Sequence, residues 1–488
     1  MIKSLKDKIS NNLIKILFVI VCIMFAIPSI KYYINNKTIF KFEQWFKFLL
    51  NDTNRISQTY IYVLIICALI LLYFLIVKNR EKIFKSNKQM FAFIAIVTVI
   101  FIAVIPFTSS DIFYYLGIGR LNSTYHQNPY YITIKEFVEQ GTNSQYLESD
   151  TVLAQGYINV WSNSTVVYGP IWTAICKIVA SLSFGNIDIG LLIFKTLNVL
   201  VHLLNCYLIY KITHKKMFTL LYGLNPYILI EGIACVHNDI FVVLFTLASF
   251  YFLLKKKNIL VSILFLALAT AIKYFTILLL PFIIIYHFRK EKPIKRFKNC
   301  ILCGLVFIIT LIMFYLLYIQ DFNVFSGLFI QQGKIAKSFY VIIIEYFTEP
   351  DGLASKINSF LLKAFIIIYF FTCVIILNKK YIKWQKEIQK ANYFIIAFLF
   401  LLITNFQPWY IMWLFPCFMW QKSKDIKLII QISLISQIAN SVFLAYGEGW
   451  KYGTPFTFIM IIGTLCAVLY NTRSKNKLKI LEVYNWIN

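Results

Sequence analysis

The sequence predicts an all-α, polytopic integral membrane protein with about fourteen transmembrane helices. Three observations lead to this prediction. Of the 488 residues, 59% are hydrophobic and only 14% are charged. Apolar runs of about 14 to 22 residues, close to the length that crosses a bilayer, recur from end to end. Short loops rich in Lys and Arg separate these runs, and such loops tend to remain in the cytoplasm.

The net charge of +27 comes from these short basic clusters between apolar runs. Clusters of this kind mark topology and lie beside anionic lipid head groups, so the predicted partner is the lipid bilayer and not nucleic acid. The ten cysteines lie in or beside apolar runs, which argues against a disulfide framework. Cys300 and Cys303 form a CxxC pair with no second pair or histidine, so no metal site and no cofactor are predicted.

Residues 1–89 are predicted to form an N-terminal two-helix membrane addition. The basic start MIKSLKDKISNNLIK leads into an apolar run without a small-residue cleavage site, which indicates a retained signal anchor with a cytoplasmic N-terminus. The first span is expected at about 13–30. The second, at about 59–77, ends at the basic cluster KNREKIFKSNK.

Residues 90–290 are predicted to form the catalytic core. A span at about 90–107 runs outward, and residues 108–188 are expected to form one large outer loop with interfacial helices. The apolar stretch 166–184 is not counted as a span, because doing so would place the basic KITHKK at 211–216 outside. Loops of this length are usually functional.

Two short hairpins follow the inward span at about 189–210. Their arms lie at about 217–233 and 239–254, and at about 258–272 and 274–288. Each arm has about 15 residues and reaches about 23 Å, short of the ~30 Å hydrocarbon core. The turns should therefore end below the outer surface and form a polar cavity within the outer leaflet.

Residues 291–488 are predicted to form a C-terminal transmembrane region with an outer segment at 321–357. The sequence NFQPWY should turn on the outer side, and the C-terminus should lie in the cytoplasm like the N-terminus. The expected spans are at about 299–319, 358–377, 391–406, 408–421, 426–446 and 454–470.

Asp111 is the candidate catalytic residue. It follows the third predicted span, in the stretch PFTSSDIFYYLGIGRLNSTYHQNPY at 106–130, and few structural roles require a carboxylate at that depth. The alternative is a helix cap, because Ser109, Ser110 and Asp111 all suit the start of a helix.

The other polar candidates fall on the same predicted outer side, although the topology was drawn only from basic loops. A carboxylate that faces cations suits glycosyl transfer from a lipid phosphate, because the attacking hydroxyl needs a base and the departing phosphate needs positive charge. One carboxylate suffices for an inverting displacement. Asp239 is a candidate second carboxylate for a retaining route, or an orienter of His237 or of the acceptor. The candidates besides Asp111 are Arg120, Tyr168, His237, Asn238, Asp239, Lys273, Gln407 and Trp409.

Each of these residues has a structural alternative. The His237 to Asp239 segment can satisfy the ends of two short helices. Lys273 can snorkel to the outer interface. Trp409 and Tyr410 suit an interfacial anchor, and Tyr168 with Gly169 and Pro170 suits a helix start.

These residues also carry a family resemblance. The segments SSDIFYYLGIGRLNSTYHQNPY, VVYGPIW, GLNPYILIEGIACVHNDIFV, AIKYFTILLLPF and QPWYIMW, in that order over about 300 residues, resemble the GT-C glycosyltransferases. The resemblance is strongest to bacterial polyprenol-phosphate-mannose-dependent mannosyltransferases. The two spans ahead of residue 90 depart from the usual GT-C core.

The resemblance implies that Asp111 is the general base and that the donor is a polyprenyl-phosphate sugar, used outside the cell where nucleotide sugars are absent. It places Arg120, Lys273 and His237 at the donor phosphate. It places Tyr168, Asn238, Asp239, Gln407 and Trp409 at the sugar or at a glycan or glycolipid acceptor. Mannose is the expected sugar, and the richness in Lys, Asn and Ile suggests a bacterial undecaprenyl carrier and a role in cell-envelope glycan synthesis.

Other functions remain open from sequence. An O-antigen ligase or polymerase type would also need cations on the outer face, but it transfers a whole oligosaccharide. A lipid or sugar transporter would show internal repeats and charges spread between its halves, and neither is evident. A purely structural membrane scaffold would not need Asp111 and Lys273.

Overall fold

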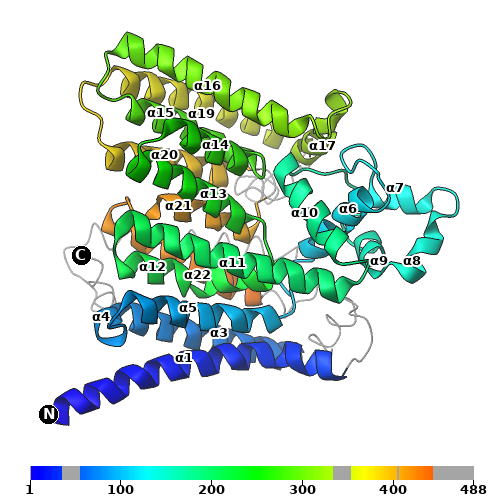
Figure 1. The fold of residues 1–488 in the computed structure, drawn as a ribbon, viewed down its shortest axis with the longest axis vertical. Coiled ribbons are helices and arrows are strands. Elements are labelled where there is room, and N and C mark those ends of the chain that lie inside the picture. The colour runs from blue at the N-terminus through cyan, green and yellow to red at the C-terminus, as the bar shows by residue number, and fades with distance from the viewer. Residues whose placement is uncertain (1, 36–54, 334–352, 404–405, 443–488) are drawn as a thin grey trace.

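The computed structural model describes residues 2–35, 55–333, 353–403 and 406–442, and every regular element within them is a helix (Figure 1). Elements labelled η are 3-10 or π helices. The elements are α1 Ile2–Asn35, α3 Arg55–Lys78, α4 Arg80–Ile83, α5 Asn87–Ile100, η1 Phe101–Ala103, α6 Asp111–Ser123, α7 Ile134–Glu139, η2 Asn143–Gln145, α8 Tyr146–Ser149, α9 Thr151–Tyr157, α10 Pro170–Leu182, α11 Ile187–Thr213, α12 Lys216–Gly223, η3 Ile228–Ala234, α13 Asp239–Tyr251, η4 Phe252–Lys256, α14 Ile259–Thr270, η5 Tyr274–Leu279, α15 Leu280–His287, α16 Pro293–Tyr315, η6 Phe322–Phe325, α17 Ser326–Gly333, α19 Leu353–Asn378, α20 Trp384–Ala397, η7 Phe398–Leu402, η8 Pro408–Leu414, α21 Phe415–Phe418 and α22 Ser423–Val442.

Five helices in the described part of the chain are long and apolar enough to cross a membrane, and a sixth span results if α12 and η3, bent by 58°, are counted as one. A count of about fourteen is not confirmed. A helix or a broken helix nevertheless lies at each predicted span except 454–470, which is outside the described residues, as is much of the outer segment 321–357. The long apolar helices lie at Asn11–Ile34, Tyr60–Lys78, Ile187–Thr213, Pro293–Tyr315 and Lys356–Asn378.

The short helices of residues 108–188 gather at one end of the molecule. In Figure 1, α6 to α10 and α17 lie together at the right, whereas α4 and the N-terminus lie at the left. α6 packs against both α9 and α10, so this segment forms one folded unit. α10 has 13 residues, too few to cross the hydrocarbon core as an α-helix.

α13 lies at the centre of the fold, where it packs against α11 and α14. Its first turn carries Asp239, which is completely buried. The hairpin arms are short and broken: α14 has 12 residues, and the next arm is divided into η5 and α15. A 12-residue helix is about 18 Å long. The turn between α14 and η5 therefore ends among other side chains, which accounts for the burial of Lys273 there.

A close backbone contact joins this turn to the segment 108–188. The Gly169 amide donates to the Ile272 carbonyl at 3.2 Å, and the Ile171 amide donates to the Ala271 carbonyl at 3.1 Å. A Cβ atom on Gly169 would lie 2.2 Å from the Ala271 oxygen, so only glycine permits this approach. The contact fixes Tyr168 beside Lys273.

Candidate active site

Asp111 is placed by a break in the helix that precedes it. The 3-10 helix η1 ends at Ala103, and the chain then runs irregularly to the start of α6 at Asp111. The buried Lys195 on α11 donates to the carbonyls of Ile102 and Val104. Carbonyls at a buried helix end need such partners, so Lys195 stabilises the break that delivers Asp111.

The Asp111 carboxylate contacts side chains and caps no helix. Its Oδ1 accepts from Trp161 Nε1 at 3.2 Å, and its Oδ2 accepts weakly from the Tyr115 hydroxyl at 3.5 Å. α6 has Ser110 at its N-cap position, with no side-chain capping hydrogen bond. The Asp111 side chain therefore does not cap α6, whereas the Ser109 hydroxyl serves the helix start by accepting from the Asp111 amide at 3.0 Å. The side chain is available for chemistry although it is only 5% exposed.

His237 lies between Asp111 and a second buried acid. Its Nδ1 is 3.9 Å from Asp111 Oδ2, and its Nε2 is 3.3 Å from Glu231 Oε2. Trp409 stacks on the imidazole with ring centroids 3.9 Å apart, and Thr108 donates to Glu231 Oε2 at 2.9 Å. His237 and Glu231 are completely buried. The three side chains form a row with Asp111 at the end nearest the pocket.

The backbone just before His237 is strained. Val236 has φ of +60°, a conformation that β-branched residues rarely adopt. Such a residue costs about 1 to 3 kcal/mol and persists where the surrounding structure imposes it, often at functional sites. The strained turn follows the π-helix η3 and orients His237 toward Asp111.

Lys273 pairs with Asp239 instead of standing alone. Its Nζ is 2.8 Å from Asp239 Oδ1, and Trp413 Nε1 donates to the same oxygen. The ammonium group also lies over the Tyr410 ring, 4.3 Å from the centroid. Asp239 therefore fixes Lys273 and not His237, which differs from the orienting role considered above. The pair leaves Lys273 as a positioned cation beside the pocket.

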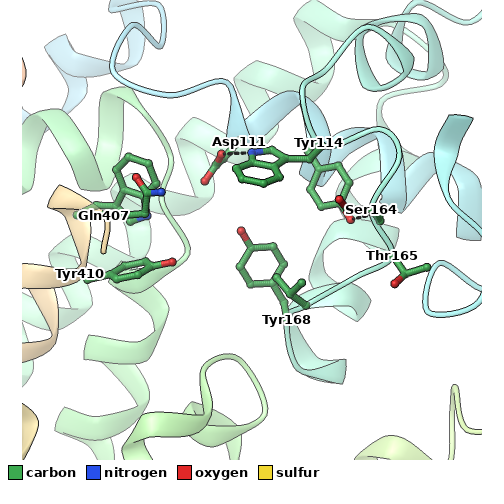
Figure 2. A pocket seen from close by; sticks show the side chains of 10 residues that line it. Asp111, Tyr114, Ser164, Thr165, Tyr168, Gln407 and Tyr410 are labelled. Atoms are coloured by element: carbon green, nitrogen blue, oxygen red, sulfur yellow. Dashed lines mark hydrogen bonds between the residues drawn. The ribbon is translucent and has the colours of Figure 1, made fainter. Parts of the chain in front are cut away.

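A pocket opens in front of Asp111, and its empty space, together with the open solvent at its mouth, is about 470 Å³. Figure 2 shows the Tyr168 hydroxyl aimed toward Asp111 and the Tyr410 hydroxyl pointing into the same space. Burial raises the pKa of Tyr168 well above its usual range, and the Asp111 carboxylate adds to the rise. Tyr168 is therefore a neutral hydroxyl that can donate. The remaining lining side chains are Tyr114, Trp161, Ser164, Thr165, Val167, Gln407 and Trp409.

A second, more apolar pocket of about 1180 Å³ adjoins the first. The two share three residues, Val167, Tyr168 and Tyr410. Lys273 lines the second pocket only, close to where the two meet. Its other walls come from η5, α17, α19, η7 and η8, and include Phe275, Leu328, Leu362, Phe398, Leu402 and Trp413. The site thus has a polar, aromatic compartment and an apolar compartment, and Tyr168 and Tyr410 lie at the boundary between them.

The structure brings most of the predicted site residues together. Asp111, Tyr168, Gln407 and Trp409 line the first pocket. His237 lies directly behind Asp111, and Asn238 and Asp239 follow it in the buried turn. Asn238 is completely buried, and neither atom of its amide has a hydrogen-bond partner among the described residues.

Arg120 is not part of this arrangement. Its guanidinium group binds Asp150, which also accepts from the Tyr125 hydroxyl at 2.9 Å. Arg120 lines neither pocket. The expected contact of Arg120 with a donor phosphate therefore finds no support in this geometry, and Arg120 instead ties α6 to the start of α9.

Several site residues were not identified from sequence. Glu231 lies in the apolar run GLNPYILIEGIAC, and an acid in such a run is a recognisable signal. Trp161 and Trp413, which donate to the two aspartates, carried no such signal. Within the described residues, no three His, Cys, Asp or Glu side chains gather closely enough to hold a metal ion.

A carboxylate, the Lys273 cation and aromatic walls in a helical protein with membrane-length apolar helices are groups that an enzyme of glycosyl transfer could use. Comparison with known families agrees. Residues 17–289, more than half of the chain, match the family model described as alpha-(1->6)-mannopyranosyltransferase, N-terminal domain. The chain belongs to this mannosyltransferase family, which is of the GT-C type.

The matched region contains Asp111, Glu231, His237 and Lys273, and it begins within α1, so it includes the C-terminal part of α1 together with α3 and α4. Gln407 and Trp409 lie beyond it. No curated protein and no solved structure matches the chain.

Proposed function

We propose that this protein transfers a single hexose, mannose in the first instance, from a polyprenyl-phosphate sugar to a glycan or glycolipid acceptor. The transfer takes place on the extracytoplasmic face and inverts the anomeric centre. The observation that carries the proposal is the position of Asp111. It faces the polar pocket, while the Asp239-bound Lys273 lines the adjoining apolar pocket.

The two pockets suit the two substrates. An apolar groove with a cation near its inner end fits a lipid chain and its phosphate. One wall of it, with Leu362, belongs to α19, which is long and apolar enough to cross a membrane. The polar pocket offers aromatic faces and the polar groups of Ser164, Thr165 and Gln407 to a sugar acceptor. The reacting carbon would then lie between Asp111 and Lys273, at the Tyr168 and Tyr410 boundary.

In this mechanism Asp111 takes the proton of the acceptor hydroxyl as that oxygen attacks the anomeric carbon. The bond from this carbon to the phosphate oxygen breaks, and polyprenyl phosphate leaves with the bonding electrons. Lys273 stabilises the growing negative charge on the phosphate. A single carboxylate suffices because Asp239 is engaged by Lys273 and Trp413, which disfavours a covalent intermediate on Asp239.

His237 acts behind the base in this scheme. Neither ring nitrogen of His237 makes a hydrogen bond among the described residues. A small rotation of the ring would direct an Nε2 hydrogen to Glu231 Oε2, 3.3 Å away, and the neutral imidazole would then present the Nδ1 lone pair to Asp111. The proton gained by Asp111 can pass to Nδ1 once the 3.9 Å separation closes by about 1 Å, to ordinary hydrogen-bond length. Glu231 stabilises the resulting imidazolium. The row returns to its starting state when this proton leaves to water or phosphate after product release.

The decisive experiment uses purified full-length protein with polyprenyl-phosphate mannose, glucose or N-acetylglucosamine and a panel of mannan and glycolipid acceptors. We expect transfer of one mannose per event, with the anomeric configuration of the product read by NMR. Asp111→Asn should lower kcat by about 10²- to 10⁴-fold, the usual contribution of a general base. Asp425→Asn, on α22 and outside both pockets, is the matched control and should retain activity.

Full activity in Asp111→Asn would remove Asp111 as the base. Failure of the wild-type protein with all three donors would contradict the proposed donor class. Transfer of a preassembled oligosaccharide in place of a single sugar would favour the ligase alternative.

A further inference from the structure

A second polar hollow lies at the opposite end of α16 from the sugar pocket. It is formed by the turn between α15 and α16 and the turn between α19 and α20, and its empty volume is about 1120 Å³. Figure 1 shows the start of α16 at the end of the molecule opposite α6 to α10. The basic loops on this side are the ones that the sequence predicts to be cytoplasmic. Six cationic residues line the hollow: Arg289, Lys290, Lys292, Arg296, Lys379 and Lys380.

Arg296 gives the hollow a fixed shape. It is 2% exposed, and its guanidinium group donates only to backbone carbonyls, on both turns. One nitrogen, Nη2, binds the carbonyls of Arg289 at 3.1 Å and Glu291 at 2.9 Å, while Nη1 reaches Lys379 at 3.1 Å. Nη1 also donates to the Leu377 carbonyl, and Nε donates weakly to the Phe288 carbonyl at 3.4 Å. The hollow is therefore preformed, and Arg296 itself has no donor left for a ligand.

Three lysines on the rim remain available. Lys290, Lys292 and Lys380 are exposed, and within the described residues none of them lies within ion-pair distance of a carboxylate. The nearby acids are already engaged. Glu291 pairs with Lys295 at 3.3 Å, and Glu387 pairs with Lys379 and Lys390. The hollow consequently has positive charge that the protein leaves uncompensated.

The helices that continue from the hollow face lipid. α16 and α19 pack against each other, and both are long and apolar enough to span a membrane. Their outward sides expose large apolar residues, including Ile301, Leu305 and Ile308 on α16 and Ile366 and Phe370 on α19. A free anion would use only the cations. A membrane lipid would use both the cations and the apolar surface that continues from them.

We infer that this hollow binds the phosphate-bearing head group of an anionic glycerophospholipid, whose acyl chains lie along α16 and α19. Basic pockets at the cytoplasmic ends of transmembrane helices recognise anionic head groups in this way. The site is separate from the sugar pocket and does not depend on the proposed transfer reaction.

The test measures lipid retention by the intact protein. Full-length protein in a neutral detergent is incubated with equal amounts of phosphatidylglycerol and phosphatidylcholine, repurified, and its bound lipid is quantified by mass spectrometry. The test variant is Lys290→Ala/Lys292→Ala/Lys380→Ala. The matched control is Lys255→Ala/Lys256→Ala/Lys257→Ala, which removes three exposed lysines that make no ion pair with any described residue and line no part of the hollow.

We expect the wild type and the control to retain phosphatidylglycerol over phosphatidylcholine. In the test variant, the ratio of bound phosphatidylglycerol to bound phosphatidylcholine should be about tenfold lower. Equal preference in all three proteins, or an equal loss in both triple variants, would overturn the proposal, because diffuse positive charge would then explain binding. A third arm adds inorganic phosphate. Displacement of phosphatidylglycerol at equimolar phosphate would show a free-anion site and would also overturn it.

Discussion

Replacing Glu231 with glutamine tests whether the buried row behind Asp111 assists the reaction. The substitution keeps the shape of the side chain and an acceptor for the Thr108 hydroxyl, but it removes the negative charge 3.3 Å from His237 Nε2. At that separation the attraction between the carboxylate and an imidazolium is about 5 kcal/mol at an effective dielectric constant of ~20. The amide dipole and relaxation of the site recover most of this. We therefore expect kcat to fall about 10- to 100-fold, as for other residues that act through one intermediate side chain.

The assay is single-mannose transfer at saturating donor, measured for Glu231→Gln, His237→Gln and the double variant. If Glu231 acts only through His237, the Glu231→Gln substitution should cause no further loss of kcat in a protein that already lacks His237. The double variant should then have the same kcat as His237→Gln. His202→Gln is the folding control, because His202, on α11, is equally buried but contacts the Gly223 carbonyl on α12, away from the row behind Asp111. Multiplicative losses in the double variant, or an unchanged kcat in Glu231→Gln, would refute the relay.

Three further predictions concern residues around the two pockets. Lys273→Gln removes the cation at the apolar pocket and leaves Asp239 buried with a neutral partner, so kcat/KM for the lipid donor should fall about 100-fold in steady-state assays; a change only in acceptor KM would contradict this role. Tyr168→Phe deletes the hydroxyl that points toward Asp111 and should reduce kcat/KM about 5- to 20-fold with unchanged thermal stability, whereas a stability loss without a kinetic effect would make Tyr168 a packing residue. Gly169→Ala places a Cβ atom 2.2 Å from the Ala271 oxygen and should destabilise the protein by about 1 to 3 kcal/mol in thermal melts, against a silent Gly304→Ala control with open space around it.

The sequence was sufficient to locate the helices because lipid imposes long apolar runs, and those runs are visible without tertiary information. Asp111 was identifiable for the same reason: a carboxylate at the end of such a run is conspicuous. The number of true spans was less accessible. Apolar runs of similar length became the single helix α11, the broken pair η5 and α15, and the short helix α10, which apolar content alone does not distinguish.

Pairings between side chains were harder to predict than positions along the chain. Arg120 and Lys273 are both cations on the same predicted side, yet Arg120 is bound by Asp150 and only Lys273 lines a pocket. The pairing of His237 with Glu231 depends on the π-helix η3, whose wider turn changes which side chains share a face. Neither outcome follows from sequence spacing, because each depends on where the chain folds back.

Four of the site residues share one structural property, which is that each lies at a break between helices. Asp111 follows the interruption after η1, His237 follows η3, Lys273 separates α14 from η5, and Gln407 precedes η8. Broken backbone at membrane depth leaves amides and carbonyls without helical partners, and it is tolerated only where protein encloses it or a polar cavity adjoins it. Four separate breaks close to two adjoining pockets would raise the free energy of a helical protein that had no polar cavity, because their backbone polar groups would lack hydrogen-bond partners. Their convergence is what a substrate site between lipid and water requires, since irregular backbone and polar side chains can then share one enclosed space.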